Sequence, residues 1–221
     1  MSDAPDHLGS GTFVDSDSPE VIAFAKQAVD RAKNPIETAQ RLYLAVRDEI
    51  LYDPYVAFGD PESYRASAIV AAGRGFCIPK AALLAAVARA RGIPARVGFA
   101  DVRNHLATPR LLELMGGNVF AWHGYTELWL DGRWVKATPA FNLSMCERFG
   151  VHPLEFDGTR DSMLHEFDTT GQRHMEYVHE RGVFEDVPFE TIVADFREYY
   201  PTMFGDGLHG VGGDFATEAI S

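Results

Sequence analysis

The stretch GRGFCIPKAALLAAVARARGIPARVGF, residues 73–99, places a cysteine between a glycine-rich turn and a segment rich in alanine and leucine. Residues 79–90 have the composition of a helix that is buried on most sides, and Gly92 and Pro94 are typical of a helix end. Residues 95–102 then read as a β-strand. Cys77 therefore precedes a buried helix, either as a nucleophile or as a small apolar side chain that packs at the helix start.

The helix start favours the nucleophile on electrostatic grounds. Unpaired N–H groups and the positive end of the helix dipole stabilise a thiolate, so we expect the pKa of Cys77 to fall below the usual value of about 8.5. The same N–H groups can bind an oxyanion. Position alone does not distinguish a nucleophile from a buried structural thiol, because unpaired cysteines are among the most buried residues.

His123 supplies the second observation. Residues 119–130 and 133–141 are β-branched and aromatic runs joined by Asp131-Gly132, which is a strong signal for a hairpin. His123 lies on the first of these strands. A cysteine before a helix and a histidine on a strand are the pattern of a nucleophile and its base.

These pieces together resemble the transglutaminase-like superfamily. The matching residues are Gly75-Phe76-Cys77, the segment from Arg89 to Arg96, the segment from His123 to Glu127, and Gly132-Arg133-Trp134. The resemblance covers about residues 19–145. It implies a papain-like α+β fold, in which N-terminal helices and a central helix carrying the cysteine pack on an antiparallel β-sheet. It also implies a Cys-His-Asp triad and acyl transfer or amide hydrolysis through a thioester.

The third member of that triad departs from the family pattern, because Thr138-Pro139 stands where family members usually have Asp-Pro. A two-residue turn at 131–132 would pair Tyr125 with Thr138 and His123 with Ala140.

Thr138 and Asn142 would then be diagonal neighbours of His123. Asparagine is an accepted orienter of a catalytic histidine, whereas threonine accepts a ring N–H but cannot offset imidazolium charge. The orienting group is therefore Thr138, Asn142 or a distant carboxylate such as Asp157, and we expect a neutral oxygen.

Two further residues are candidates for substrate binding. Glu127 shares a strand face with His123 and is either a supporting group or a paired structural acid. Lys80 lies on the helical face of Cys77, where it favours the thiolate, binds a substrate carboxylate or is simply solvated at the helix end. Arg96 is expected to pair with a core acid.

The remaining elements are predicted from local signals. Residues 1–18 read as a flexible arm, residues 19–203 as the domain and residues 204–221 as a loosely ordered tail. Two helices are expected from residue 19 and over 36–52, then a loop over 53–67 and a short turn over 67–72. A loop is expected over 103–118, irregular structure beyond 150 and a last helix over 187–200.

Composition limits the classes of partner. The 221 residues have a net charge of −12, which repels phosphate backbones and anionic membranes, so neither nucleic acid nor a membrane is expected as a partner. Two cysteines are too few for a disulfide scaffold, and His165, His174 and His179 match no metal-ligand spacing, so no cofactor or metal is expected. The polar N-terminal stretch predicts a cytoplasmic protein.

The predicted function is a cysteine-dependent acyl-transfer enzyme that hydrolyses a peptide or other small amide substrate. Cys77 attacks the carbonyl and His123 moves the proton. The sequence does not choose between water and an amine as the acyl acceptor. The alternative is a transglutaminase-like domain that has lost its chemistry and binds a peptide or a protein, for which Thr138 is the best argument.

Overall fold

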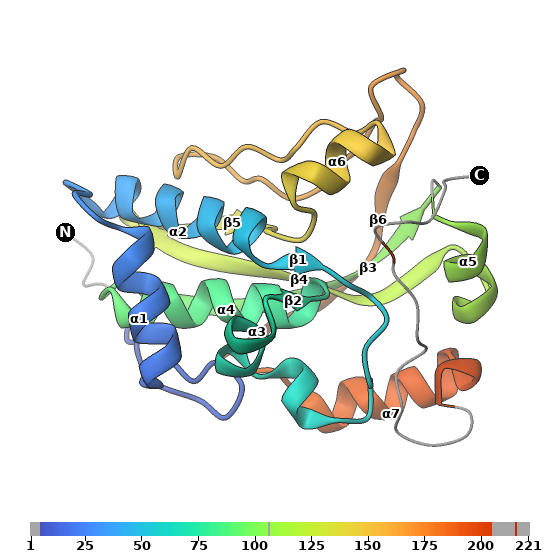
Figure 1. Ribbon diagram of the computed structural model, residues 1–221, viewed down its shortest axis with the longest axis horizontal. Coiled ribbons are helices and arrows are strands. Elements are labelled where there is room, and N and C mark those ends of the chain that lie inside the picture. The colour runs from blue at the N-terminus through green and yellow to red at the C-terminus, as the bar shows by residue number, and fades with distance from the viewer. Residues whose placement is uncertain (1–4, 106, 205–214, 216–221) are drawn as a thin grey trace.

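The computed structural model describes residues 5–105, 107–204 and 215, and it confirms an α+β fold. A four-stranded antiparallel sheet has the strand order β5-β4-β3-β6, and helices α1, α2 and α3 gather around α4 (Figure 1). A short parallel pair, β1 and β2, lies apart from this sheet. The elements are α1 Pro19–Ala28, α2 Pro35–Glu49, β1 Leu51–Tyr52, η1 Pro61–Tyr64, α3 Ala66–Ala72, β2 Arg74–Gly75, α4 Cys77–Ala90, β3 Ala95–Asn104, α5 Pro109–Met115, β4 Val119–Leu130, β5 Arg133–Ala137, α6 Leu143–Phe149, β6 Met175–Phe184, α7 Phe189–Tyr199 and η2 Pro201–Phe204.

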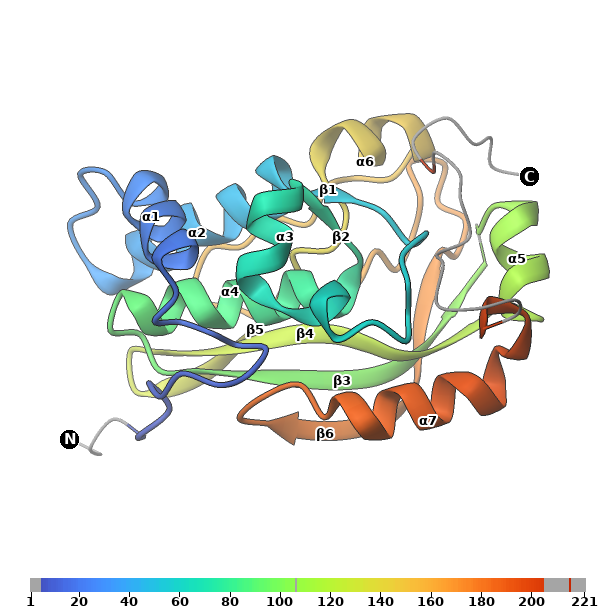
Figure 2. The same ribbon diagram turned by 60° about the horizontal axis from the view of Figure 1, so that its bottom comes forward.

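Helix α4 is the centre of the core. Every residue from Ile78 to Arg89 is buried, as the alanine and leucine composition predicts. The helix lies along β4 and β3 and contacts α1, α2 and α3 on its other sides (Figure 2). Small side chains let these neighbours approach closely, so α4 is enclosed on nearly all sides.

The helix starts follow their predicted caps. Ser18 Oγ accepts a hydrogen bond from Val21 N, and Asn34 Oδ1 accepts one from Glu37 N. Each cap is followed by a proline, whose missing N–H costs nothing at the first helical position. Helix α2 ends at Glu49, earlier than predicted, because residues 51–52 leave it to form β1.

The hairpin is confirmed, but its second strand is shorter than predicted. Trp129 pairs with Trp134, and Asp131 and Gly132 both have positive φ, as a tight two-residue turn requires. The ladder ends at Ala137, where the chain turns to a different neighbour.

The predicted pairs Tyr125–Thr138 and His123–Ala140 therefore do not form. Ala137 bridges Ser162, and Thr138 N donates to Ser162 O over 2.9 Å. The pairing with Ser162 directs the chain away from β4. Pro139, which follows, has no backbone N–H and could not have continued the ladder.

Two elements, α5 and β6, lie where the sequence predicted a loop or irregular structure, and a third, α6, lies in a stretch for which no element was predicted. Helices α5 and α6 have seven residues each, and β6 is a strand of ten residues paired antiparallel with β3. Strand β6 is an edge strand that is exposed along most of its length, so it lacks the apolar alternation by which a strand is predicted. The predicted last helix is confirmed as α7.

The N-terminal segment packs on the domain. Phe13 and Val14 are buried, and the Asp186 carboxylate accepts hydrogen bonds from the backbone N–H groups of residues 12–14. The division into arm, domain and tail remains a prediction, and most of the predicted tail lies outside the described residues. Phe215 is described there and is buried against Tyr52 and Tyr55.

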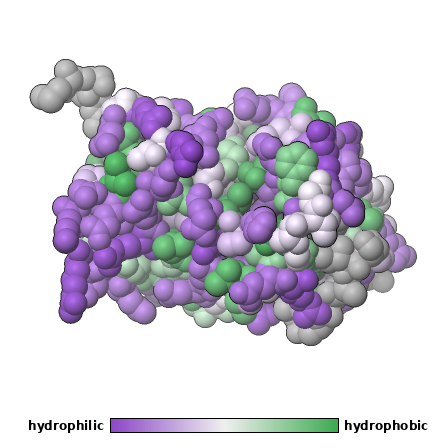
Figure 3. All heavy atoms as spheres, turned by 90° about the horizontal axis from the view of Figure 1, so that it is seen from above, coloured by the Kyte–Doolittle hydropathy of each residue, from purple (hydrophilic) through white to green (hydrophobic). Residues whose placement is uncertain are grey.

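The face seen in Figure 3 is mainly hydrophilic, with apolar side chains in small separate groups. Among the helices that the structure describes, none is long and apolar enough to cross a bilayer.

A close contact between two backbones joins β4 to the start of α4. A Cβ atom on Gly124 would lie 2.9 Å from Ile78 Cα and 3.1 Å from Cys77 O, so only glycine fits there without movement. This contact sets the neighbouring His123 beside the residue that begins the helix.

Replacing Gly124 with alanine should therefore push β4 and α4 apart. We expect Gly124→Ala to lower the free energy of unfolding by about 1–3 kcal/mol, measured by urea denaturation. Gly117→Ala is the matched control, because a Cβ there meets no atom within 4 Å, and its effect should stay within about 0.5 kcal/mol. Equal stabilities of the two variants would contradict this account.

Candidate active site

Cys77 is the first residue of α4, as predicted, and its side chain is half-buried. Backbone N–H groups of Gly124, Ile78 and Cys77 itself interact with the thiol and lower its pKa. Burial acts in the opposite direction and is the larger effect, so the pKa of the Cys77 thiol rises to about 11. The predicted low pKa is therefore wrong, because the desolvation of a thiolate outweighs the helix dipole here.

His123 lies on β4 directly before Gly124 and lines the same cavity as Cys77. The imidazole is buried, and burial lowers its pKa to about 4. At neutral pH the two groups are therefore a neutral thiol and a neutral imidazole. Cys77 and His123 thus line one cavity, and their joint catalytic role stays a prediction.

A β-bulge precedes His123. Ala100 pairs with His123 and Val102 with Phe120, so Asp101 alone faces the two residues between them on β4. One of these, Trp122, has a φ of 60°, which is a strained value for a bulky residue. Such bulges are common beside active sites, where they redirect a side chain.

Charged groups hold this bulge in place. Asp101 accepts a hydrogen bond from Trp122 N over 3.1 Å, and the Trp122 indole donates to Asp195 over 2.8 Å. Arg181 donates to both carboxylates over 2.8–2.9 Å. Sequence reasoning missed Arg181 and Asp195, because their contacts join β3, β6 and α7, which are distant in the chain.

Of the two predicted orienting side chains, Asn142 has other partners and Thr138 has none among the described residues. Asn142 Oδ1 accepts from Tyr52 N over 3.0 Å, and its amide nitrogen donates to Ser144 Oγ over 2.7 Å. Thr138 Oγ1 is buried and has no hydrogen-bond partner among the described residues. Neither side chain is hydrogen-bonded to His123, so both orienting roles are corrected: β5 ends before the register reaches them.

Asp157 does not supply a carboxylate to His123 either. Its side chain accepts hydrogen bonds from Thr159 and Arg160 in a surface turn, and these bonds lower its pKa to about 2.

Two polar residues that the sequence did not assign to the Cys-His site lie close to His123. Asn104, buried at the end of β3, and His174 line a second cavity together with His123. The Phe141 ring stacks on both His174 and His165. Across the described ranges, no group of three or more His, Cys, Asp or Glu side chains could hold a metal ion.

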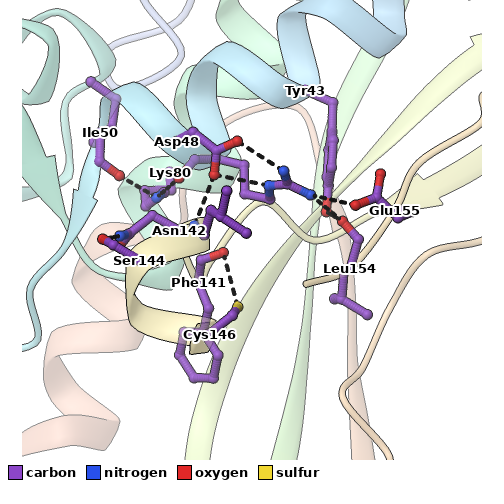
Figure 4. Close-up of polar contacts among 12 residues, drawn as sticks. Tyr43, Asp48, Ile50, Lys80, Phe141, Asn142, Ser144, Cys146, Leu154 and Glu155 are labelled. Carbon is purple, nitrogen blue, oxygen red and sulfur yellow. Dashed lines mark hydrogen bonds and ion pairs between the residues drawn. The ribbon is translucent and has the colours of Figure 1, made fainter. Parts of the chain in front are cut away.

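Lys80 does not face the cavity and is completely buried. Its ammonium donates to the carbonyl oxygens of Arg47, over 2.9 Å, and Ile50 at the end of α2 (Figure 4). Burial lowers its pKa to about 7. The predictions of a substrate-binding or solvated lysine are corrected, because α4 is covered on this face by α2.

Glu127 also has a structural role in place of the predicted substrate contact. Its carboxylate lies 2.6 Å from the guanidinium of Arg96, which stacks on Trp134 at 4.1 Å. Arg96 thus pairs with a core acid, as predicted.

The remaining thiol, Cys146, is buried as expected and lies 3.8 Å from His165 Nε2.

The raised pKa of Cys77 predicts a distinctive alkylation profile. In a Cys146→Ser background, the rate with iodoacetamide should rise about tenfold per pH unit up to about pH 10 and stay below that of glutathione near pH 7. The thiolate is the nucleophile, so a plateau between about pH 5 and 8 would instead indicate a thiolate–imidazolium pair.

The unpaired hydroxyl of Thr138 predicts a gain in stability. Thr138→Val removes a buried group without a partner and should raise the free energy of unfolding by about 1 kcal/mol while leaving Cys77 alkylation unchanged. Thr126→Val is the matched control and should lose about 1 kcal/mol or more, because Thr126 Oγ1 donates to Ala81 O over 2.8 Å. A slower alkylation of Thr138→Val would restore Thr138 to the site.

The chain is similar to two proteins of solved structure at low sequence identity, and it matches one family pattern. Among solved structures, a "Putative Cysteine Protease" from Cytophaga hutchinsonii is 16% identical, with a TM-score of 0.49, over 83% of this chain and 49% of that one. A "Putative Protease" from Parabacteroides distasonis is 18% identical, with a TM-score of 0.39, over 57% of this chain and 24% of that one. The chain thus spans about half the length of the first and a quarter of the second. No match is found among curated proteins. The pattern of the transglutaminase-like superfamily matches residues 22–139, which include Cys77 and His123, and the chain belongs to that superfamily.

Proposed function

We propose that this protein is a cysteine-dependent hydrolase that cleaves a peptide or other amide bond through a thioester on Cys77. The observation that carries the proposal is that Cys77, at the start of a buried helix, lines one cavity with His123. Membership of the superfamily supports the same class of chemistry.

The neutral resting pair suggests how the first step proceeds. The thiol proton passes to His123 as Cys77 Sγ bonds to the substrate carbonyl carbon, since neither ion is stable in the buried site beforehand. Backbone N–H groups at the start of α4 then stabilise the oxyanion. The imidazolium returns the proton to the leaving amine as the C–N bond breaks.

Water completes the cycle. His123 accepts a proton from water as the oxygen attacks the thioester, and the C–S bond then breaks to give a carboxylic acid and the free thiol. An amine at this step would give a new amide instead. We favour water, and hence a protease or amidase over a cross-linking enzyme.

The second candidate is a peptide- or protein-binding domain without catalysis. The observation that favours it is that no carboxylate among the described residues is hydrogen-bonded to His123. A neutral environment stabilises imidazolium poorly.

Acylation by p-nitrophenyl acetate separates the two candidates. We expect the intact mass to show one acetyl group on Cys77 that is then lost to water, with acetate exceeding the amide when methylamine is added. His123→Ala should slow acylation about 100-fold or more, because general base catalysis contributes at least this much. Cys146→Ser is the matched control and should react as the native protein does. A native Cys77 that is not acylated faster than the His123→Ala variant would leave only the binding domain.

A further inference from the structure

The cavity beside Cys77 is a built apolar pocket. It lies between the start of α4, the bulged part of β4 and the C-terminal elements α7 and η2, and its volume is about 50 Å³. This is several times the roughly 10–15 Å³ that one water molecule needs. The space is therefore large enough for part of a ligand.

The far wall of this pocket comes from outside the family core. Phe196 of α7, Tyr200 directly after α7 and Met203 of η2 line it, and all three follow the matched residues 22–139. Met115 at the end of α5 adds a further apolar side chain. The C-terminal extension, to which the sequence assigned no role, thus forms part of the site.

The pocket offers apolar surface and no charge. None of the described residues that line it is an acid, a lysine or an arginine, and burial keeps His123 neutral at physiological pH. The Tyr200 hydroxyl is already engaged, because it donates to Val119 O over 3.2 Å and accepts from Ala121 N over 2.5 Å. A charged group would lose its hydration here without gaining a partner.

We propose that this pocket binds an apolar side chain on the acyl part of the substrate, so that the enzyme acts on amides whose acyl group carries a leucine-sized apolar chain. This inference rests on the proposed function. The acyl group is the part of the substrate that stays bonded to Cys77 in the thioester, so it is also the part that lies beside the pocket. The substrate class is a peptide or amide with an apolar acyl residue.

Alkylation tests the pocket independently of catalysis. In a Cys146→Ser background near pH 9, the rate ratio of N-butyliodoacetamide to iodoacetamide at Cys77 is compared with the same ratio for glutathione. We expect the ratio at Cys77 to be about tenfold higher or more, since each buried methylene group raises affinity about fourfold.

Met203→Trp and Met115→Trp should each fill the pocket and return the ratio to that of glutathione. Met163→Trp is the matched control and should keep the native ratio, because Met163 lines a separate groove formed by residues between 152 and 177. A native ratio equal to that of glutathione, or one unchanged in both blocking variants, would overturn the proposal.

A pair of esters then separates this inference from the proposed function. Hydrolysis of p-nitrophenyl butanoate should exceed that of the acetate, by a factor that Met203→Trp abolishes. A butyl preference in alkylation without ester turnover would disprove the proposed function and leave an apolar binding pocket. Turnover of both esters at equal rates would support the function and refute the acyl pocket.

Discussion

The contact between the backbone of Gly124 and the first turn of α4 is the constraint on which the site depends. A strand normally keeps its side chains between itself and a neighbouring helix, but here the missing Cβ lets the two backbones meet. The residue before the glycine is His123, and the residue at the start of the helix is Cys77. One small residue thus brings together two side chains that the chain separates by two helices, α4 and α5, and a strand, β3. The β-bulge, with the positive φ of Trp122, lies directly before His123 in β4.

Burial governs the chemistry of the site more strongly than charge does. The thiol of Cys77, the imidazole of His123 and the ammonium of Lys80 all have pKa values shifted towards their neutral forms by desolvation. The apolar side chains that line the cavity exclude water from Cys77 and His123, and helix α2 covers Lys80. The three side chains are therefore held towards their uncharged forms. The apolar pocket beside Cys77 and His123 is consistent with this environment.

Local signals predicted the central elements of the fold, and long-range contacts account for what was missed. The Ser18 and Asn34 caps, the buried α4 and the turn at residues 131–132 are each specified within a few residues, so sequence suffices for them. Strand β6 is specified by its partner β3, not by its own pattern.

The residues of the candidate site show the same difference between local motifs and long-range contacts. Cys77 and His123 were predicted because each sits in a recognisable local motif. Thr138 and Asn142 failed because their roles required the register of the hairpin to continue past Ala137, and the competing bond to Ser162 is invisible in the sequence. Lys80 was placed on the correct face of its helix, but helical spacing does not reveal how deeply a face is buried.

The carboxylate that binds the N-terminal segment also constrains the order in which the chain folds. Asp186 lies more than 170 residues from the backbone groups of residues 12–14 that it binds. During synthesis the segment that carries Phe13 and Val14 therefore emerges long before its partner exists, and it can dock only after Asp186 has been made. Strand β3 likewise can pair with β6 only after residues 175–184 have been made. Contacts between residues so far apart in the chain slow folding and leave apolar surface exposed in the meantime, so this part of the native structure forms late.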